Sequence, residues 1–277
     1  MLFHAILKSP EMRLRAALAS LLLLGFWGVM RAQKPFKEYP ALEYENFPLP
    51  AGWQDKTEWT RARLKYPDIT HGMYGRDVYW TMDYPRSDRH LLQGVRRLTR
   101  IDSRSVEQVV DLDGTDDIYN WPMLYAVEVG FWELSVEKAA QLREFLNRGG
   151  FLMVDDFHGT REWDIFTASM DLVFPDRRIV DLENSDPIFH NLYDLEERFQ
   201  VPGWGAWMEG HVTYEKGGIE PHWRGIYDAK GRLVVAICHN LDLGDAWEHS
   251  DNPRYPEKFA SLAYRIAMNY FVYDLTH

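Results

Sequence analysis

The chain has 277 residues, of which 31 are Lys or Arg and 42 are Asp or Glu, giving a formal net charge of −11. Hydrophobic residues make up 46% and charged residues 26% of the chain, which is typical of a folded globular protein and excludes a disordered or collagenous chain. The single cysteine excludes an internal disulfide framework. Because nucleic acid is bound by basic surface, the acidic balance also predicts that nucleic acid is not a partner.

The first 32 residues carry a pattern typical of protein export. Residues 16–30 are uncharged, and Arg13 and Arg15 stand directly before them. A basic segment followed by a short apolar stretch predicts a signal peptide, and the stretch is shorter than the about 20 apolar residues of a membrane-spanning helix. We therefore expect a periplasmic or secreted protein. The alternatives are an uncleaved N-terminal membrane anchor, which would be its one contact with a membrane, or a buried helix.

Residues 33–58 form an entry segment rich in proline and aromatic residues, and residues 59–277 are predicted to form a single α/β domain. Strands are expected at residues 60–66, 109–112, 123–127, 151–154, 179–182, 225–227 and 232–238, and helices at 88–100, 135–148, 161–174 and 256–273. Strands that alternate with helices favour a mostly parallel sheet with helices on both faces, a three-layer sandwich. The long stretch 201–224 is expected to be irregular.

Three polar segments lie where buried strands are expected to end. They are residues 82–90 after the first strand, residues 155–159 after the strand at 151–154, and residues 239–248 after the strand at 232–238. Ligands of open α/β sheets bind at the carboxyl ends of the strands, so we expect the three segments to meet in one pocket. The candidate catalytic residues are Asp155, Asp156, His158 and His239. The candidate ligand-binding residues are Asp83, Asp88, Arg89, His90, Asp242, Asp245 and Trp247.

Structural interpretations of these segments remain open. Asp155 and Asp156 could cap the helix that follows them, because Asp at a helix N-terminus accepts backbone N–H groups. Tryptophans near the strand ends could stack on a sugar ring or could belong to the core and its loop cover. These tryptophans are Trp121, Trp132, Trp204, Trp207, Trp223 and Trp247.

A metal site and a thiol nucleophile are less favoured alternatives. His239 with Asp242, Asp245 and Glu248 could bind a divalent cation. Their spacing matches no standard calcium loop, so a solvated acidic loop is the favoured interpretation and no metal ligand is assigned. Cys238 stands beside His239, but neighbouring residues of a strand point to opposite faces, which favours a buried structural thiol.

Several motifs are informative in combination. They are Trp80 with Asp83-Tyr84-Pro85 and Asp88-Arg89-His90, Pro122 to Tyr125, Gly149 to Leu152 with Asp155 to Gly159, Asp186 to His190, and His239 to Glu248. Together they resemble the bacterial domain of unknown function 4159 family, over about residues 59–276. The resemblance implies a flavodoxin-like fold similar to the class I glutamine amidotransferase-like superfamily, without an established activity. The turn after residues 151–154 lacks the nucleophilic cysteine of glutamine amidotransferases, so glutaminase activity is not expected.

The sequence therefore predicts an exported α/β domain that binds a polar small molecule, for example a saccharide, at the strand ends. A hydrolase without a covalent intermediate is the alternative: Asp155 or Asp156 would activate water and His158 or His239 would act as the acid, with or without a metal. An interaction domain of the cell envelope is a second alternative. No cofactor is identified by the sequence.

Overall fold

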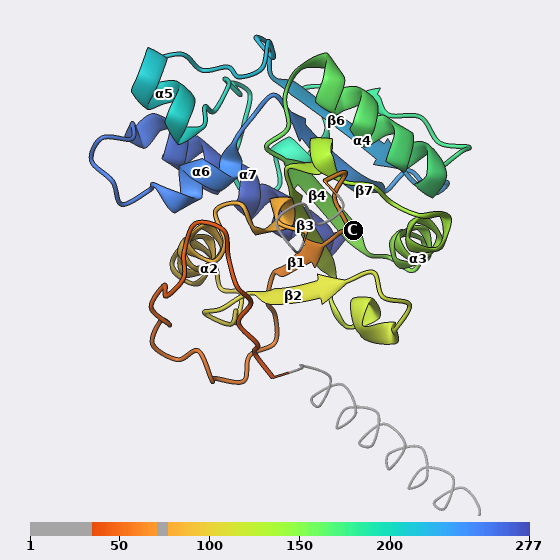
Figure 1. Cartoon of the computed structure of the whole chain (residues 1–277), viewed down its shortest axis with the longest axis horizontal. Helices are drawn as coiled ribbons and strands as arrows, with labels where there is room; N and C mark the ends of the chain where they lie inside the picture. Colours follow the sequence, from red (N-terminus) through yellow and green to blue (C-terminus); the bar gives the residue numbers. More distant parts are fainter. Residues whose placement is uncertain (1–34, 71–76) are drawn as a thin grey trace, which may run out of the picture. The chain divides into compact units, whose positions relative to one another are not determined.

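The computed structural model describes residues 35–70 and 77–277 (Figure 1). The predicted signal segment, residues 1–32, lies outside the described residues. Within the described part of the chain, no helix combines the length and the apolar character that crossing a membrane requires.

A seven-stranded sheet forms the centre of residues 36–277, with the strand order β2-β1-β3-β4-β7-β6-β5. The strands are β1 (Ala62–Lys65), β2 (Gln108–Asp111), β3 (Met123–Val127), β4 (Phe151–Asp155), β5 (Val180–Asp181), β6 (His222–Tyr227) and β7 (Leu233–His239). β2, β1, β3, β4 and β7 run parallel to one another, whereas β6 and β5 pair antiparallel at one side. The predicted α/β class with a mostly parallel sheet is confirmed.

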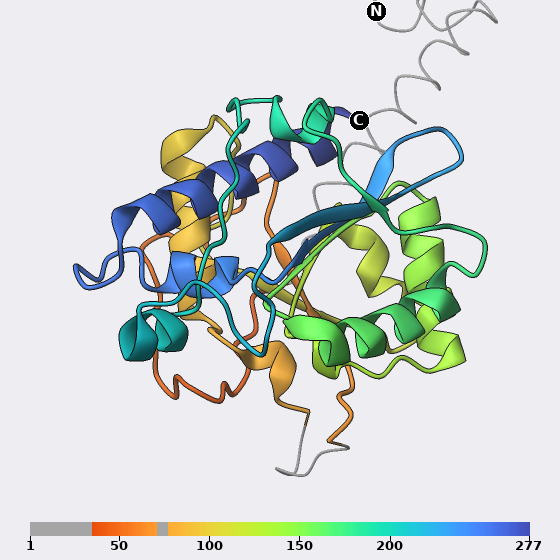
Figure 2. The ribbon, with the colours of Figure 1, turned by 90° about the horizontal axis from the view of Figure 1, so that it is seen from above.

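Helices cover both faces of the sheet. They are α2 (Arg86–Leu98), α3 (Val136–Asn147), α4 (Gly159–Val173), α5 (Trp204–Gly210), α6 (Leu243–Glu248) and α7 (Glu257–Thr276), with short 3-10 helices η2 (Tyr79–Thr81), η3 (Asp116–Asn120), η4 (Val129–Phe131) and η5 (Pro187–Phe189). α2, α6 and α7 pack on one face, and α3 and α4 on the other (Figure 2). The sequence pattern did not predict α5 and α6, because helices of one or two turns are too short to show a periodicity.

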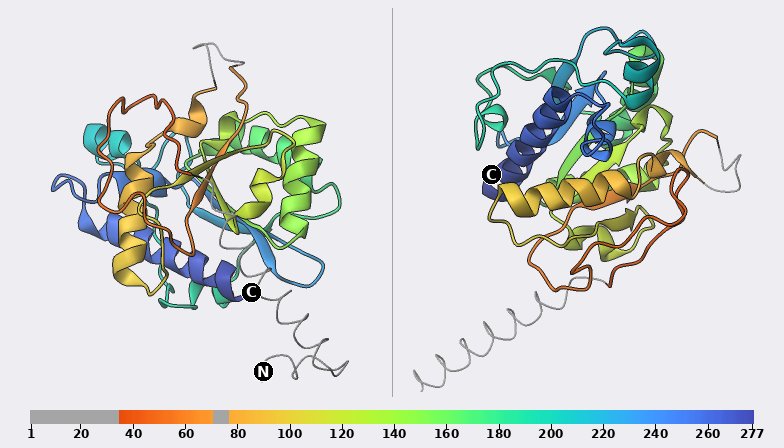
Figure 3. Two further views of the ribbon diagram at one scale, coloured as in Figure 1. Left: turned by 90° about the horizontal axis from the view of Figure 1, so that it is seen from below. Right: turned by 90° about the vertical axis from the view of Figure 1, so that its left-hand side faces the viewer.

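The two faces of the sheet receive alternating side chains, as the pleat of a strand requires. On β4, Leu152 belongs to the core beneath α3 and α4, and Met153 to the core beneath α7. β3 and β4 are buried along their whole length, which agrees with their continuous apolar sequences. Two further views in Figure 3 show the strands enclosed between these helices.

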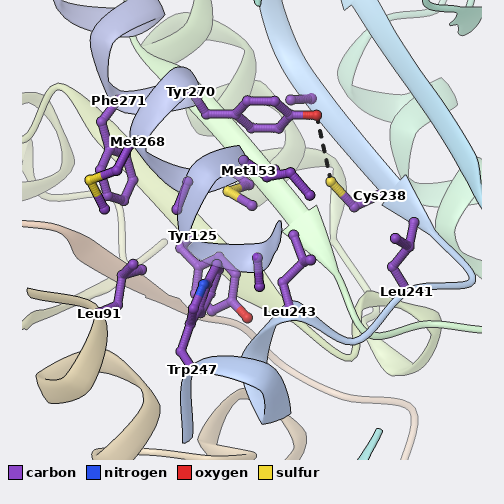
Figure 4. Close-up of a cluster of buried hydrophobic side chains, with 14 of the residues drawn as sticks. Leu91, Tyr125, Met153, Cys238, Leu241, Leu243, Trp247, Met268, Tyr270 and Phe271 are labelled. Atoms are coloured by element: carbon purple, nitrogen blue, oxygen red, sulfur yellow. Dashed lines mark hydrogen bonds between the residues drawn. The ribbon is translucent and has the colours of Figure 1, made fainter. Parts of the chain in front are cut away.

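Cys238 on β7 is a core residue, as expected. Its side chain is fully buried, and Sγ lies 3.8 Å from the Tyr270 hydroxyl (Figure 4). Burial raises the pKa of the Cys238 thiol well above its usual range, so the reactive thiolate is disfavoured. His239 packs on the other face of the sheet, against Phe157 and Trp163.

The parallel strands β3, β4 and β7 end at one edge of the sheet, which we call the carboxyl edge. The residue that follows each of these strands has a left-handed backbone: Glu128 (φ 50°), Asp156 (φ 51°) and Asn240 (φ 63°). Asp83, in the turn before α2, has the same conformation (φ 58°). Asn and Asp adopt this region more readily than other non-glycine residues, so polar side chains occupy the sharp turns at the edge.

The entry segment is fastened along α2. The Arg89 guanidinium donates to the carbonyl oxygens of Phe47 (2.7 Å) and Pro48 (3.2 Å) and pairs with Glu38 (2.5 Å). The Tyr39 N–H donates to the Tyr84 hydroxyl at 3.2 Å. These contacts bring residues 38–48 close to the turn that carries Asp83.

Candidate functional site

Asp83, Asp156 and Asp242 meet at the carboxyl edge, and we call these three residues the carboxylate cluster. One carboxylate oxygen of each lies within 4.8 Å of the others. Asp156 follows β4, Asp242 follows β7, and Asp83 precedes α2. The three residues are only 5%, 7% and 4% exposed. Each of the three polar segments singled out in the sequence therefore contributes one residue to the same place.

Contacts with neighbouring residues orient the cluster. The His158 Nε2 lies 3.2 Å from Asp156 Oδ1, and the Asp245 N–H donates to Asp242 Oδ1 at 2.7 Å. The Asp83 N–H donates to Glu43 Oε2 at 2.8 Å. The buried Asp83 Oδ2, however, has no hydrogen-bond partner among the described residues.

The cluster lies in a strongly acidic environment. Burial, followed by the negative charge of neighbouring carboxylates, raises the pKa of Asp83 and of Asp242 well above the usual range. The carboxylates responsible for these shifts, apart from the cluster itself, are Glu43, Glu215, Asp245 and Glu248. Lys216 is nearby, but its Nζ pairs with Glu162 (2.8 Å) and Glu128 (3.6 Å). Negative charge therefore exceeds positive charge at this place.

Two glycines permit the close approach of the carboxylates. A Cβ atom on Gly244, in α6, would clash with Asp83 Oδ2. A Cβ atom on Gly203 would clash with Glu215 Oε1 and would lie 2.8 Å from Asp242 Oδ2. Larger residues at either position would push the carboxylates apart.

Asp155 is a capping residue rather than a member of the cluster. Its Oδ2 accepts the backbone N–H groups of Leu243 (2.8 Å) and Gly244 (3.2 Å) at the start of α6. Asp155 was expected to cap α4, the helix that directly follows β4. It instead caps α6, which comes from a distant part of the chain. Burial raises the pKa of the fully enclosed Asp155 to about 7.

Asp88 lies below the edge, in a buried ion-pair network. It contacts the guanidinium groups of Arg61 and Arg63, with Arg63 Nε 2.8 Å from Asp88 Oδ2. The two arginines lower the pKa of Asp88 although burial opposes them. All three side chains are at most 1% exposed, so Asp88 holds the fold together and cannot reach a ligand at the surface.

Arg89, His90 and Trp247 also lie outside the cluster. Arg89 binds the entry segment, as described above, and His90 Nδ1 lies 3.1 Å from the Trp247 carbonyl oxygen. Trp247 is fully buried beside Tyr125 (Figure 4). Its ring has no free face for a sugar, so the expectation of a Trp247 stacking surface is wrong.

His239 lines a separate cavity of about 490 Å³ at the same edge, which we call the edge cavity. The cavity lies between the start of α4, residues 217–220, the start of β6 and the end of β7. Its polar and aromatic walls include Thr160, Trp163, His222, Arg224, His239 and Asn240. Only His239 and Asn240 among these side chains lie in a polar segment recognised in the sequence. The others are spread over a helix and a strand whose polar faces resemble ordinary solvated surface.

The environment of His239 keeps its imidazole neutral. His239 Nε2 lies 3.2 Å from the Gly159 carbonyl oxygen and Nδ1 lies 3.4 Å from Arg224 Nη1. Burial, with further contributions from Arg224 and His222, lowers the pKa of His239 to about 3. At neutral pH His239 therefore lacks the extra proton that an imidazolium acid would donate.

The cation site considered for the acidic segment after β7 does not form as one group. His239 lies in the edge cavity and Asp242 in the carboxylate cluster. Asp245 and Glu248 instead approach His249, whose Nε2 is 3.5 Å from Asp245 Oδ1 and 3.6 Å from Glu248 Oε2. The short helix α6, which the sequence pattern did not predict, separates these positions.

Comparison with known proteins identifies the family. A family model described as domain of unknown function (DUF4159) matches residues 62–275, well over half of the chain. The chain belongs to this family. The match includes the carboxylate cluster and the edge cavity and confirms the membership expected from the motifs. A comparison with curated proteins gave no match, and the family description states no activity.

Proposed function

We propose that this DUF4159 domain binds a polar small molecule, with a saccharide as the first candidate, in the edge cavity. The observation that carries the proposal is the cavity itself, about 490 Å³ at the carboxyl end of β7 and the start of α4. Small-molecule sites occupy clefts of about 300–1,000 Å³, and open α/β sheets bind ligands at this edge.

The lining of the cavity favours a neutral ligand rich in hydroxyl groups. Burial lowers the pKa of both His222 and His239. A neutral His222 imidazole offers one donor and one acceptor, whereas the ring nitrogens of His239 already contact Gly159 and Arg224. The charge of Arg224 is compensated by Asp181, whose Oδ1 lies 2.9 Å from Arg224 Nε. Thr160 adds a hydroxyl group at the start of α4. Paired donors and acceptors match sugar hydroxyls better than a strongly charged anion.

Two further parts of the proposal rest on sequence and topology. Export is inferred from the basic and apolar residues at positions 13–30. The five parallel strands, numbered along the chain, occur in the spatial order 2-1-3-4-5, which is the order of flavodoxin-like sheets. This order supports a flavodoxin-like fold of the glutamine amidotransferase-like kind.

The proposal is tested by thermal unfolding of the full-length chain with a panel of neutral mono- and disaccharides at millimolar concentration. A bound ligand raises the unfolding temperature, and calorimetry then gives its dissociation constant. Loss of one neutral hydrogen bond is worth about 0.5–1.5 kcal/mol, so Thr160→Val and His222→Ala should weaken binding by about two- to twelvefold. Thr167→Val, on the same helix α4 but away from the cavity, should leave affinity unchanged. Absence of any stabilising sugar, or equal effects of Thr160→Val and Thr167→Val, would contradict the proposal.

A hydrolase remains the second candidate because of the contact between His158 Nε2 and Asp156 Oδ1 at 3.2 Å. A carboxylate and a histidine in contact can activate water. Asp156→Asn separates the two functions once a ligand is found. Loss of turnover with unchanged affinity identifies an enzyme, whereas binding without turnover in the unmodified protein identifies a binding module.

A further inference from the structure

We propose that the carboxylate cluster binds one hard divalent cation, such as Ca²⁺ or Mg²⁺, at a site distinct from the edge cavity. Carboxylate oxygens of Asp83, Asp156 and Asp242 lie within 4.8 Å of one another. Two oxygens bound to one ion lie at most about twice the metal–oxygen distance apart, which is about 5 Å for Ca²⁺ and about 4 Å for Mg²⁺. Separations of up to 4.8 Å are within the limit for Ca²⁺ and exceed the limit for Mg²⁺, so the arrangement favours Ca²⁺ as the ion shared by the three carboxylates.

The buried Asp83 Oδ2 provides independent support for a ligand at this place. Asp83 is 95% enclosed, and no described residue donates a hydrogen bond to Oδ2. An unsatisfied buried carboxylate oxygen is costly, and such atoms are rare in folded proteins. A carboxylate oxygen of Asp83 belongs to the group that lies within 4.8 Å. Oδ2 packs closely against Gly244, where a side chain would clash with it. An ion held by the Asp83 carboxylate would compensate for the hydrogen bond that Oδ2 lacks.

Nearby protein cations do not neutralise the cluster. Lys216 is engaged by Glu162 at 2.8 Å. Arg63 is engaged by Asp88 at 2.7 Å and by the carbonyl oxygens of Trp80 and Met82. Bound protons are the competing explanation, and the experiment below separates them from an ion.

The donor set selects the class of ion. Three carboxylates present oxygen atoms only, which suit Ca²⁺ and Mg²⁺ rather than the softer Zn²⁺. The nearest imidazole, that of His158, contacts Asp156 Oδ1 at 3.2 Å. It is placed to orient Asp156 from outside the coordination sphere, as hydrogen-bond partners of metal-binding carboxylates do.

A second acidic group nearby is a weaker candidate. Asp245 and Glu248 lie within 4 Å of His249 Nε2, and Asp245 Oδ2 accepts the Trp204 N–H at 2.5 Å. These contacts engage Asp245, Glu248 and His249 Nε2, although the buried His249 Nδ1 has no hydrogen-bond partner among the described residues. We therefore assign the ion to Asp83, Asp156 and Asp242.

The site is tested by calorimetric titration of the full-length, chelator-treated chain with CaCl₂ and with MgCl₂, without any sugar. We expect one ion per chain and a higher unfolding temperature with the ion than with chelator. Asp83→Asn and Asp156→Asn should each weaken binding at least about tenfold, because loss of an outer-shell contact alone costs about 10–100-fold. Asn preserves the size of both side chains and accepts their left-handed backbone.

Asp251→Asn is the matched control. Asp251 is an exposed carboxylate that pairs with Arg86, at the start of α2, at 2.7 Å, so its removal changes the charge but not the proposed ligands. The affinity of the Asp251→Asn variant for the ion should stay within about twofold of that of the original protein.

Absence of binding at millimolar Ca²⁺ and Mg²⁺ would overturn the proposal and favour bound protons. Equal affinities of Asp251→Asn, Asp83→Asn and Asp156→Asn would overturn it as well. Circular dichroism confirms that each variant is folded, and either Asp variant alone suffices if the other does not fold. Because sugar is absent, failure of the sugar proposal leaves this result unaffected.

Discussion

Asp83 and Asp88 stand five residues apart, and both are buried, but their surroundings are opposite. Asp88 lies between Arg61 and Arg63, which lower the pKa of its carboxyl group. Asp83 lies among other carboxylates, and burial together with their charge raises the pKa of its carboxyl group. Burial of a carboxylate therefore does not by itself indicate a ligand. A buried carboxylate whose charge the protein already balances is structural, whereas one whose charge is unbalanced indicates a binding site.

The largest expected effect on stability is at Asp88, whose charge the two arginines balance. Asp88→Asn leaves two buried guanidinium groups without their counter-charge, so the free energy of unfolding should fall by about 3–5 kcal/mol. Urea denaturation measures the change. The matched control is Asp111→Asn, which removes a half-exposed ion pair with Lys65 (2.6 Å) on the same strand β1 and should cost at most about 1 kcal/mol. Similar losses in the two variants would show that burial of the Asp88 network is energetically unimportant.

Glu107 is an intermediate case, because it is buried beside both an arginine and another carboxylate. It is fully buried, and Arg89 Nε lies 3.6 Å from its Oε2. Burial, with a contribution from Asp88, nevertheless raises the pKa of Glu107 from 4.5 to about 7.

The raised pKa fixes the sign of a pH effect. The contribution of protonated Glu107 to the free energy of unfolding is fully present below pH 4.5, the pKa of this group in the unfolded chain. It is lost as the pH rises through about 7, the pKa in the folded protein. Glu107→Gln should therefore be more stable relative to the original protein at about pH 8 than at about pH 5, by at most about 3 kcal/mol. Urea denaturation at both values measures this difference. A difference that is independent of pH would mean that Arg89 keeps Glu107 ionised throughout.

At Asp83, whose charge is not balanced by arginines, substitution should change the free energy of unfolding in the opposite direction. In the presence of chelator, Asp83→Asn removes an unpaired buried carboxylate, and we expect the free energy of unfolding to rise by about 1 kcal/mol. With saturating Ca²⁺ the original protein should regain the advantage, because only it binds the ion tightly. Urea denaturation under the two conditions gives the comparison. Destabilisation of Asp83→Asn in chelator would place Asp83 with Asp88 among the structural carboxylates.

Sequence patterns predicted the strands and the edge of the sheet, but they could not separate these two kinds of carboxylate. The apolar strand at 151–154 and the polar residues after it predicted that Asp156 lies at the carboxyl edge. The arginines that make Asp88 structural come from β1 and the residue before it, more than 20 residues earlier. In the sequence, Arg61 and Arg63 look like the solvated face of a strand.

Other parts of the site could not be predicted from the sequence because they depend on a short helix and on strand pairing. α6 has six residues, too few to show a helical periodicity, so Asp242, Asp245 and Glu248 looked like one acidic loop. Its fold divides them between the carboxylate cluster and the contacts of His249. The edge cavity was missed for a related reason, because Trp163 and Arg224 become neighbours only when β6 pairs with β7 beside α4.

The smallest expected effect lies at the outer rim of the cluster. Glu43 is exposed on the entry segment, and its Oε2 accepts the Asp83 N–H at 2.8 Å. Exposed charges contribute about 0.2–1 kcal/mol, so Glu43→Gln should weaken Ca²⁺ binding by at most about fivefold in a calorimetric titration. Glu45→Gln, an exposed neighbour on the same segment, should have no effect. Glu43, Asp83 and Glu248 also approach one another within 4.8 Å. If Glu43→Gln lowered the Ca²⁺ affinity as much as Asp156→Asn, the ion would instead be assigned to Glu43, Asp83 and Glu248. A small decrease supports its assignment to Asp83, Asp156 and Asp242.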